Sequence, residues 1–251
     1  MCTLALYFQV LDDFPVLVAA NRDEHYDRPA AAPMVLNTQP RMLAGQDLRA
    51  GGTWLGVNEH GVLAAILNRR SDESSDPPSR SRGLLCLDLL ACKTATDARK
   101  FMEVQRERYQ PFTVVFVDPK DAWFAFNTPG RIESEKLSPG LHVFSNAAIH
   151  DEASEKRQRA YGLFAKAQPT DEKFSATASW IGELQKALSD HTLGNSASDP
   201  REAICVHGEV SGTVSSSIVV FSKSARRFCM LYCAGAPCQT EFSDAPKLDV
   251  Q

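Results

Sequence analysis

The 251-residue chain lacks a long apolar segment and lacks a surplus of basic residues. No apolar run reaches the roughly 18 residues that span a bilayer, so we expect no transmembrane helix. The 27 Lys and Arg residues are outnumbered by 31 Asp and Glu, which gives a formal net charge of -4. Because nucleic-acid-binding proteins carry a basic footprint that is missing here, we expect no nucleic-acid partner.

The cysteines and the first residues bear on the compartment. Seven cysteines is an odd number, and their spread through the chain is typical of reduced thiols rather than of a disulfide framework. The opening segment MCTLALYFQVLDDF has no basic region and no small-x-small cleavage site before Asp12, so we expect no secretory signal. With 43% hydrophobic and 23% charged residues, the composition favours a globular protein. We expect one domain over residues 1–251, in the cytoplasm.

Short apolar segments predict strands that are covered on both faces. The clearest lie at 3–10, 16–20, 53–57, 62–67, 112–117 and 216–221. Short turns at 58–61 and 118–121 predict two antiparallel hairpins, of which the second is completed by a strand at 122–127.

Helical spacing of apolar residues predicts helices at 83–92, from 94 to about 109, at 155–167 and at 176–189. Thr94 followed by Asp97 is a variant of the capping box. Polar stretches at 71–82 and 189–201 are predicted to be exposed loops. Strands and helix pairs therefore alternate along the chain. This order predicts an α+β fold, a four-layer α-β-β-α sandwich of two packed antiparallel sheets.

Cys2 stands at the second position of the chain. Methionine aminopeptidases remove Met1 when the next side chain is small, and the new α-amine has a pKa of about 7.7–8.0. Such an amine can act as the base for the thiol of the same residue. The alternative is that Cys2 is a small apolar residue that starts a buried strand.

Asn21, Arg22, Asp23 and Glu24 follow the second predicted strand directly. Charges at the end of an apolar strand need partners, because an unpaired buried charge is costly. One interpretation is a structural network that joins Arg22 to Asp23 or Glu24. The other is that Asp23 orients the α-amine of Cys2 while Arg22 lowers the pKa of its thiol.

Three motifs together resemble the NRDE family, which comprises transport and Golgi organisation protein 2 and its bacterial relatives. They are MCTL at the start, NRDE at 21–24 with Arg28-Pro29 after it, and GGTWLG at 51–56. Further matching pieces are AILN at 65–68, SRG at 81–83, FSNA at 144–147, AICV at 203–206 and Gly212-Thr213. The resemblance covers nearly the whole chain in order.

The resemblance implies an N-terminal nucleophile hydrolase-like fold, similar to choloylglycine hydrolases and penicillin V acylases. It assigns Cys2 as nucleophile, Arg22 and Asp23 as its supporting pair, and Asn68 and Asn146 as amide donors to the oxyanion. For the two Asn residues, local hydrogen bonds to the backbone are the alternative. Two departures stand out: Val214 replaces the Arg of the usual Gly-Thr-Arg, and ASEK at 153–156 replaces a Trp-Pro-Lys-like stretch.

Haem trafficking is a second implication of the resemblance. No CxxCH motif occurs, so haem would be reversible cargo and no cofactor is required. His25 is the candidate ligand beside the NRDE segment, and Trp54 is a candidate pocket residue that packs beneath or lines the site. Three functions stay open: a carrier of haem or a similar amphipathic metabolite, a cysteine amidohydrolase acting on a non-peptide C–N or acyl bond, and a membrane-trafficking or Golgi-organisation interaction protein.

The remaining cysteines predict no metal site. Cys229 and Cys233 fall two strand periods apart on one face of a strand-like segment, which favours buried thiols over zinc. Four residues separate Cys233 from Cys238, and Cys205 with His207 forms a C-x-H. The aromatic run at 123–126 is predicted to be core.

Overall fold

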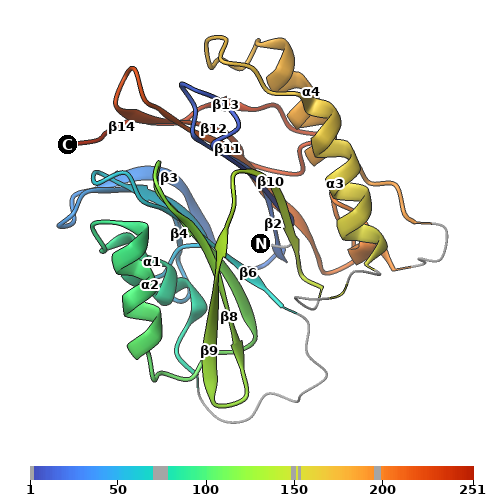
Figure 1. The fold of residues 1–251 in the computed structure, drawn as a ribbon. Coiled ribbons are helices and arrows are strands. Elements are labelled where there is room, and N and C mark those ends of the chain that lie inside the picture. Colours follow the sequence, from blue (N-terminus) through green and yellow to red (C-terminus); the bar gives the residue numbers. More distant parts are fainter. Residues whose placement is uncertain (1–2, 70–78, 148–150, 152–153, 195–198) are drawn as a thin grey trace.

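The computed structural model describes residues 3–69, 79–147, 151, 154–194 and 199–251. These residues form two antiparallel sheets, each covered by a pair of helices (Figure 1). The first sheet joins segments from both ends of the chain in the order β10-β1-β2-β11-β12-β13, with β14 also paired to β12. Its strands are β1 (Thr3–Phe8), β2 (Val16–His25), β10 (Gly140–Ser145), β11 (Ser211–Ser222), β12 (Arg227–Cys233), β13 (Ser243–Asp244) and β14 (Leu248–Asp249).

The second sheet is a meander in which each strand pairs with the next one along the chain. Its strands are β3 (Ala30–Leu36), β4 (Met42–Asp47), β5 (Leu55–Asn58), β6 (Leu63–Asn68), β7 (Phe112–Val117), β8 (Ala122–Thr128) and β9 (Arg131–Leu137). The two predicted hairpins are confirmed as β5–β6 and β7–β8.

Two helices cover each sheet. Helices α1 (Arg82–Leu90) and α2 (Ala95–Val104) pack on the second sheet, and α3 (Glu155–Ala167) and α4 (Ser179–Leu188) pack on the first. A 3-10 turn, η1 (Pro200–Glu202), precedes β11. The predicted cap of α2 is confirmed, because the Thr94 hydroxyl accepts the backbone N–H of Asp97 at 3.0 Å. Helix α2 ends at Val104, five residues before the predicted end.

Apolar side chains form three layers between these elements. Val16, Val18 and Ala20 of β2 lie in the layer between the sheets. Leu17 and Ala19 of the same strand pack toward α3 and α4. A third layer separates the second sheet from α1 and α2. The predicted four-layer α-β-β-α sandwich is therefore confirmed.

The position of the NRDE segment corrects the prediction from sequence. Residues 21–24 lie inside β2, which continues to His25, rather than after the strand. The reason is β11, which begins at Ser211 and pairs with β2 from His25 to Val16. A neighbouring strand satisfies the backbone groups of these polar residues, so the strand continues past its apolar part. The register shifts between Thr213 and Ser215, opposite Asp23 and Arg22.

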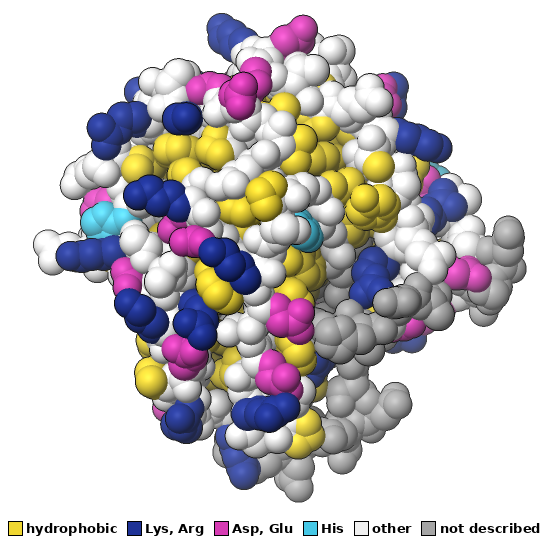
Figure 2. Space-filling view, viewed as in Figure 1, with side chains coloured by type: hydrophobic (Ala, Val, Ile, Leu, Met, Phe, Trp, Pro, Cys, Tyr) yellow, Lys and Arg dark blue, Asp and Glu magenta, His cyan; other side chains and the backbone are white. Residues whose placement is uncertain are grey.

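Charged side chains of both signs are interspersed on the face of the molecule shown in Figure 2. Among the residues that the structure describes, no helix is long and apolar enough to cross a membrane.

Candidate functional site

Strand β2 sends the NRDE side chains to opposite faces of the first sheet, because successive side chains of a strand alternate. Asn21 and Asp23 have the parity of Leu17 and Ala19, which face α3 and α4. Arg22 has the parity of Val18 and Ala20 and lies between the sheets. The NRDE segment therefore places side chains both in the layer between the sheets and in the layer between the first sheet and its helices.

Asn21 joins three segments and is fully buried. Its side-chain amide donates to the carbonyls of Leu188 and Ile204, both at 2.9 Å. Its carbonyl oxygen accepts the hydroxyl of Ser216 at 2.5 Å. Asn21 thus fixes the end of α4 and the segment before β11 against β2, and sequence reasoning assigned it no such role.

One of the two carboxylate oxygens of Asp23 has a hydrogen-bond partner among the described residues, and the other has none. Its Oδ1 accepts the hydroxyl of Thr213 at 2.6 Å, and that hydroxyl oxygen accepts the backbone N–H of Val206 at 2.8 Å. Its Oδ2 is buried and has no hydrogen-bond partner among the described residues. Because a buried carboxylate oxygen is costly without a donor, Asp23 is suited to bind a cationic or N–H donor group.

Arg22 is 5% exposed, and its guanidinium carbon lies 4.3 Å from the centroid of the Trp54 ring. Burial lowers the pKa of Arg22, against the opposing charges of Glu24 and Asp47. Within the described residues Arg22 has neither a hydrogen bond nor an ion pair from its side chain, and the acids around it pair with Arg28 instead. The structure therefore does not contain the predicted network that joins Arg22 to Asp23 or Glu24.

The first residues of β1 lie between the NRDE strand and Asn146. Thr3 pairs with Asn21 on one side and with Ser145 on the other. Asn146 follows Ser145 directly and is 8% exposed. Predicted nucleophile Cys2 lies outside the described residues.

Asn68 and His25 do not share the layer between the sheets with Arg22. Asn68 ends β6 with the parity of Ile66, which packs toward α1 and α2. Its neighbour Arg69 is the residue on the inner face: it donates to the carbonyl of Asn127 and lies 5.8 Å from the ring centroid of Phe126. His25 is exposed at the end of β2, on the face opposite Arg22. No hydrogen bond within the described residues joins either side chain to Arg22 or Asp23.

A cavity of about 70 Å³ lies at the edge strand β10 beside Ser145, lined by side chains of both sheets and of α3. Phe124 and Phe144 form an aromatic pair in its wall, with ring centroids 5.4 Å apart. The full lining consists of Thr113, Phe124, Val143, Phe144, Ser145, Ala147 and Arg157. Sites for drug-sized ligands span roughly 300–1,000 Å³, so the described cavity suits a small group rather than a macrocycle.

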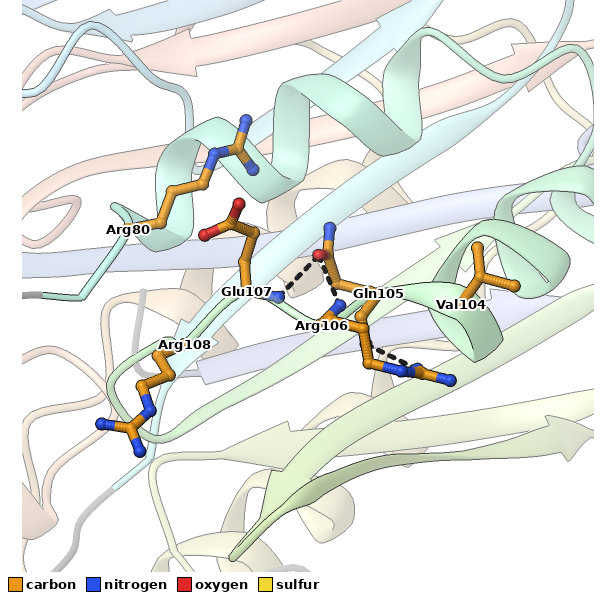
Figure 3. Close-up of a pocket in the computed structure, with 6 residues that line it drawn as sticks. All are labelled: Arg80, Val104, Gln105, Arg106, Glu107 and Arg108. Atoms are coloured by element: carbon orange, nitrogen blue, oxygen red, sulfur yellow. Dashed lines mark hydrogen bonds between the residues drawn. The ribbon is translucent and has the colours of Figure 1, made fainter.

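A larger open hollow of about 570 Å³ lies where the loop that follows α2 passes Arg80, the residue shortly before α1 (Figure 3). Its wall is polar and contains none of the predicted site residues. Arg80 is committed to Asp88 at 2.5 Å and to the Tyr109 hydroxyl at 2.8 Å. This hollow is therefore not the candidate functional site.

The GGTWLG segment shapes the turn before β5. Gly51 has a positive φ of 73°, and a Cβ on Gly52 would lie 2.6 Å from the Cα of Gly83 at the start of α1. The Trp54 ring packs against the Cα of Gly45 and is 7% exposed. Trp54 is thus a packed residue of the layer between the sheets and carries Arg22 on its face.

The structure also shows where the two departures from the family pattern lie, at Val214 and in the ASEK stretch. Val214 is the extra residue of the bulge in β11, next to the Thr213 that binds Asp23. In the ASEK stretch, Ser154 caps α3 by accepting the N–H of Arg157, and Lys156 is buried with its ammonium on the carbonyl of Arg201 at 2.9 Å. These residues have structural roles at the edge of the site.

Solved structures share this architecture. Penicillin V acylase from Agrobacterium tumefaciens aligns with 100% of this chain and 99% of its own, at a TM-score of 0.63 and 12% identity. A Caenorhabditis elegans orthologue of N-acylethanolamine-hydrolyzing acid amidase aligns with 98% of this chain and 100% of its own, at a TM-score of 0.58 and 14% identity. The fold is therefore that of the N-terminal nucleophile hydrolases.

The family follows from the sequence. The family model for Transport and Golgi organisation 2 matches residues 1–230, and the chain belongs to that family. The mouse homologue is 29% identical over 144 residues, which is 54% of this chain and 52% of the mouse protein. The human homologue is 29% identical over 146 residues, with the same shares. The aligned part spans about half the length of these curated relatives.

Proposed function

We propose that this protein is a cysteine hydrolase that cleaves a small amide or acyl bond with Cys2 as nucleophile. The observation that carries the proposal is Asp23, whose buried Oδ2 has no hydrogen-bond partner among the described residues. Asp23 lies on the strand next to β1, two residues beyond Asn21, which pairs with Thr3. An α-ammonium group on residue 2 is the kind of donor that such an oxygen accepts.

The proposed chemistry uses three residues, Cys2, Asp23 and Arg22. After removal of Met1, the α-amine of Cys2 takes the thiol proton, and the sulfur forms a bond to the substrate carbonyl carbon. The amine of the substrate takes that proton from the α-ammonium of Cys2 and leaves as the C–N bond breaks. Water then hydrolyses the thioester, which releases the acid and restores the thiol. Asp23 holds the α-amine, and Arg22 supplies positive charge near the thiol.

Asn146 is the better of the two predicted oxyanion donors. It follows Ser145, whose backbone pairs with Thr3 at the start of β1. Asn68 lies at the end of a strand in the other sheet, with the parity of the face that α1 and α2 cover. The proposal therefore assigns the amide of Asn146, and not that of Asn68, to the developing negative charge.

The test is a panel of fluorogenic N-acyl amides and thioesters with short acyl chains, because the described cavity is small. Wild-type protein is expected to turn over at least one member. Cys2→Ala is expected to abolish turnover, whereas Cys92→Ser, which alters a half-buried thiol beside α1, leaves it unchanged. Full activity in Cys2→Ala would contradict the mechanism.

Binding of haem or a similar amphipathic metabolite is the second candidate. The aromatic pair Phe124–Phe144 beside Ser145 supports it, because an apolar group of such a ligand can stack on this wall, although the described cavity is too small for a whole macrocycle. The test is titration with haem, where a Soret shift that survives Cys2→Ala supports a carrier and its absence at micromolar haem counts against one. His25→Ala and Trp54→Phe then examine the two predicted contact residues.

We place the proposed activity in the cytoplasm, where thiols stay reduced. All six cysteines in the described ranges are free thiols, which supports that compartment. An interaction function in membrane trafficking stays a third prediction, and its test is a partner that survives affinity purification with neither ligand nor turnover.

A further inference from the structure

Three segments from different parts of the chain bring two cysteines and two histidines together beside α4. The ligand atoms of His191, His207 and Cys238 all lie within 4.8 Å of one another. Cys205 Sγ lies 3.6 Å from His207 Nε2 and 3.6 Å from Cys238 Sγ. His207 Nε2 lies 3.1 Å from Cys238 Sγ. We call these four residues the Cys2His2 cluster.

From this cluster we propose a zinc-binding site with the ligands Cys205, His207, Cys238 and His191. Two thiolates and two imidazoles are a ligand set that selects a tetrahedral borderline-soft cation such as Zn²⁺. Nothing in the proposed hydrolase chemistry uses these residues, so the zinc proposal does not depend on that chemistry.

The distances fit a metal better than they fit a disulfide. With Zn–S of about 2.3 Å and Zn–N of about 2.0–2.1 Å, the edges of a tetrahedron measure about 3.4–3.8 Å. Three ligands fit these edges: Cys205 lies 3.6 Å from each of the other two, and the 3.1 Å from His207 to Cys238 is slightly shorter. The fourth, His191, is placed more loosely, within 4.8 Å of His207 and Cys238. A disulfide needs sulfurs at about 2.05 Å, well short of the 3.6 Å between Cys205 and Cys238.

The backbone around the cluster is fixed by hydrogen bonds, as a preorganised metal site requires. The N–H of Cys205 donates to the carbonyl of Asp190 at 2.8 Å, which ties it to the residue before His191. The carboxylate of Asp190 is held in turn by Arg159 at 2.8 Å. His207 forms a bridge with Gly212, next to the Thr213 that binds Asp23.

Cys238 approaches from a third direction, in the turn that follows β12. The N–H groups of Gln239 and Thr240 both donate to the carbonyl of Ala236 at 2.9 Å. The thiol of Cys233 donates to the carbonyl of Thr240 at 3.2 Å and stays outside the cluster. Zinc would therefore link the end of α4, the segment before β11 and the turn after β12.

Burial varies across the cluster in a way that permits metal entry. Cys205 is buried, Cys238 is half-buried, and both histidines are exposed. The two histidine rings meet edge to face with centroids 5.8 Å apart. On binding, the two thiols lose their protons to solvent as two Zn–S bonds form, and the histidines bind as neutral rings.

The experiment is zinc analysis of untagged protein purified without chelators and under reducing conditions, with Zn²⁺ and Co²⁺ as probes. We expect one zinc per chain, and after exchange a cobalt spectrum with tetrahedral d–d bands and a thiolate charge-transfer band. Cys238→Ser and the exposed His207→Ala are expected to lose the metal with unchanged circular dichroism. Cys229→Ser, a half-buried thiol of β12 outside the cluster, retains it.

The remaining outcomes are also decisive. Wild-type protein that binds neither zinc nor cobalt overturns the proposal, as does loss of metal from Cys229→Ser equal to that from Cys238→Ser. A Cys205–Cys238 disulfide found by mass spectrometry after alkylation of freshly isolated protein overturns it too. Cys2→Ala is expected to bind zinc like wild type, so failure of the hydrolase proposal and failure of the zinc proposal are distinguishable.

Discussion

Arg22 lies with its guanidinium over the ring of Trp54, 4.3 Å from the ring centroid, and joins the NRDE segment to the GGTWLG segment across the two sheets. The two motifs that carry the family resemblance are thus neighbours in space. One face of the guanidinium is covered by the ring, and its N–H groups are left for a partner outside the described side chains.

This arrangement predicts different costs for the two residues. Trp54→Ala is expected to lower the free energy of unfolding by about 3–5 kcal/mol, because it empties a packed position between the sheets. Arg22→Met is expected to change it by less than about 1 kcal/mol, since the buried charge is offset by a single cation–π contact. Urea unfolding of both variants checks this. A loss in Arg22→Met as large as that in Trp54→Ala would mean that Arg22 is a structural residue.

Asn21 is predicted to be structural rather than chemical. Asn21→Ala leaves two carbonyls and the hydroxyl of Ser216 without their partner. The expected cost is about 3 kcal/mol or more, because each buried unsatisfied group costs about 1–3 kcal/mol. Ser216→Ala, which removes one of the three bonds, is the control, with an expected cost near 1 kcal/mol. Equal costs for the two variants, measured by urea unfolding, would contradict this assignment.

Two glycines form a matched pair for backbone packing. A Cβ on Gly52 would lie 2.6 Å from the Cα of Gly83, whereas a Cβ on Gly162 in α3 meets nothing within 4 Å. Gly52→Ala is expected to destabilise by more than about 2 kcal/mol. Gly162→Ala is expected to stabilise by about 0.5–1 kcal/mol through helix propensity. Thermal unfolding of both variants distinguishes the signs, and a neutral Gly52→Ala would refute the close approach.

Asp47 predicts a loss of stability in acid. Burial raises the pKa of its carboxyl, but hydrogen bonds from the N–H of Ala50, from Arg28 and from the N–H of Arg49 outweigh it and hold the pKa below the ordinary 3.8. Because the folded pKa is lowered, the stabilisation is present above that ordinary value and is lost as pH falls through the lower folded pKa.

The measurement is urea unfolding of wild type and Asp47→Asn at about pH 6 and about pH 3. The stability difference between the two proteins is expected to shrink at the lower pH. Asp244→Asn, which removes an exposed carboxylate of β13, is the control for the change in net charge. A difference that stays constant with pH would show that Asp47 does not act through its charge.

Strands and helices with a clear pattern of apolar residues in their own sequence were predicted correctly. The apolar run of β7 and the helical spacing of α3 gave both elements with the bounds found in the structure. Strands β3 and β9 were not predicted, because Pro33 interrupts one and charged residues alternate through the other. Their strand conformation comes from pairing with neighbours in the second sheet.

The candidate site residues likewise fall into those that local motifs indicate and those that only the fold brings together. Arg22, Asp23 and Asn146 were predicted as site residues from the motifs that resemble the NRDE family, and their catalytic role stays a prediction. No metal site was predicted at Cys205, His207 and Cys238, and His191 was not considered, because these residues come from separate segments. Cys205 and Cys238 are 33 residues apart and meet only through the pairing of β11 with β12. Spacing along the chain instead drew attention to Cys229 and Cys233, which share one strand.

The most direct test of the hydrolase proposal is the intact mass of the purified protein, before and after acid quenching during turnover of a reactive acyl thioester. The account predicts the mass of the chain without Met1, and a quenched species heavier by one acyl group that is absent from Cys2→Ala. Retention of Met1 would leave Cys2 without a free α-amine and would contradict the proposed mechanism, as would an acyl group that persists in Cys2→Ala.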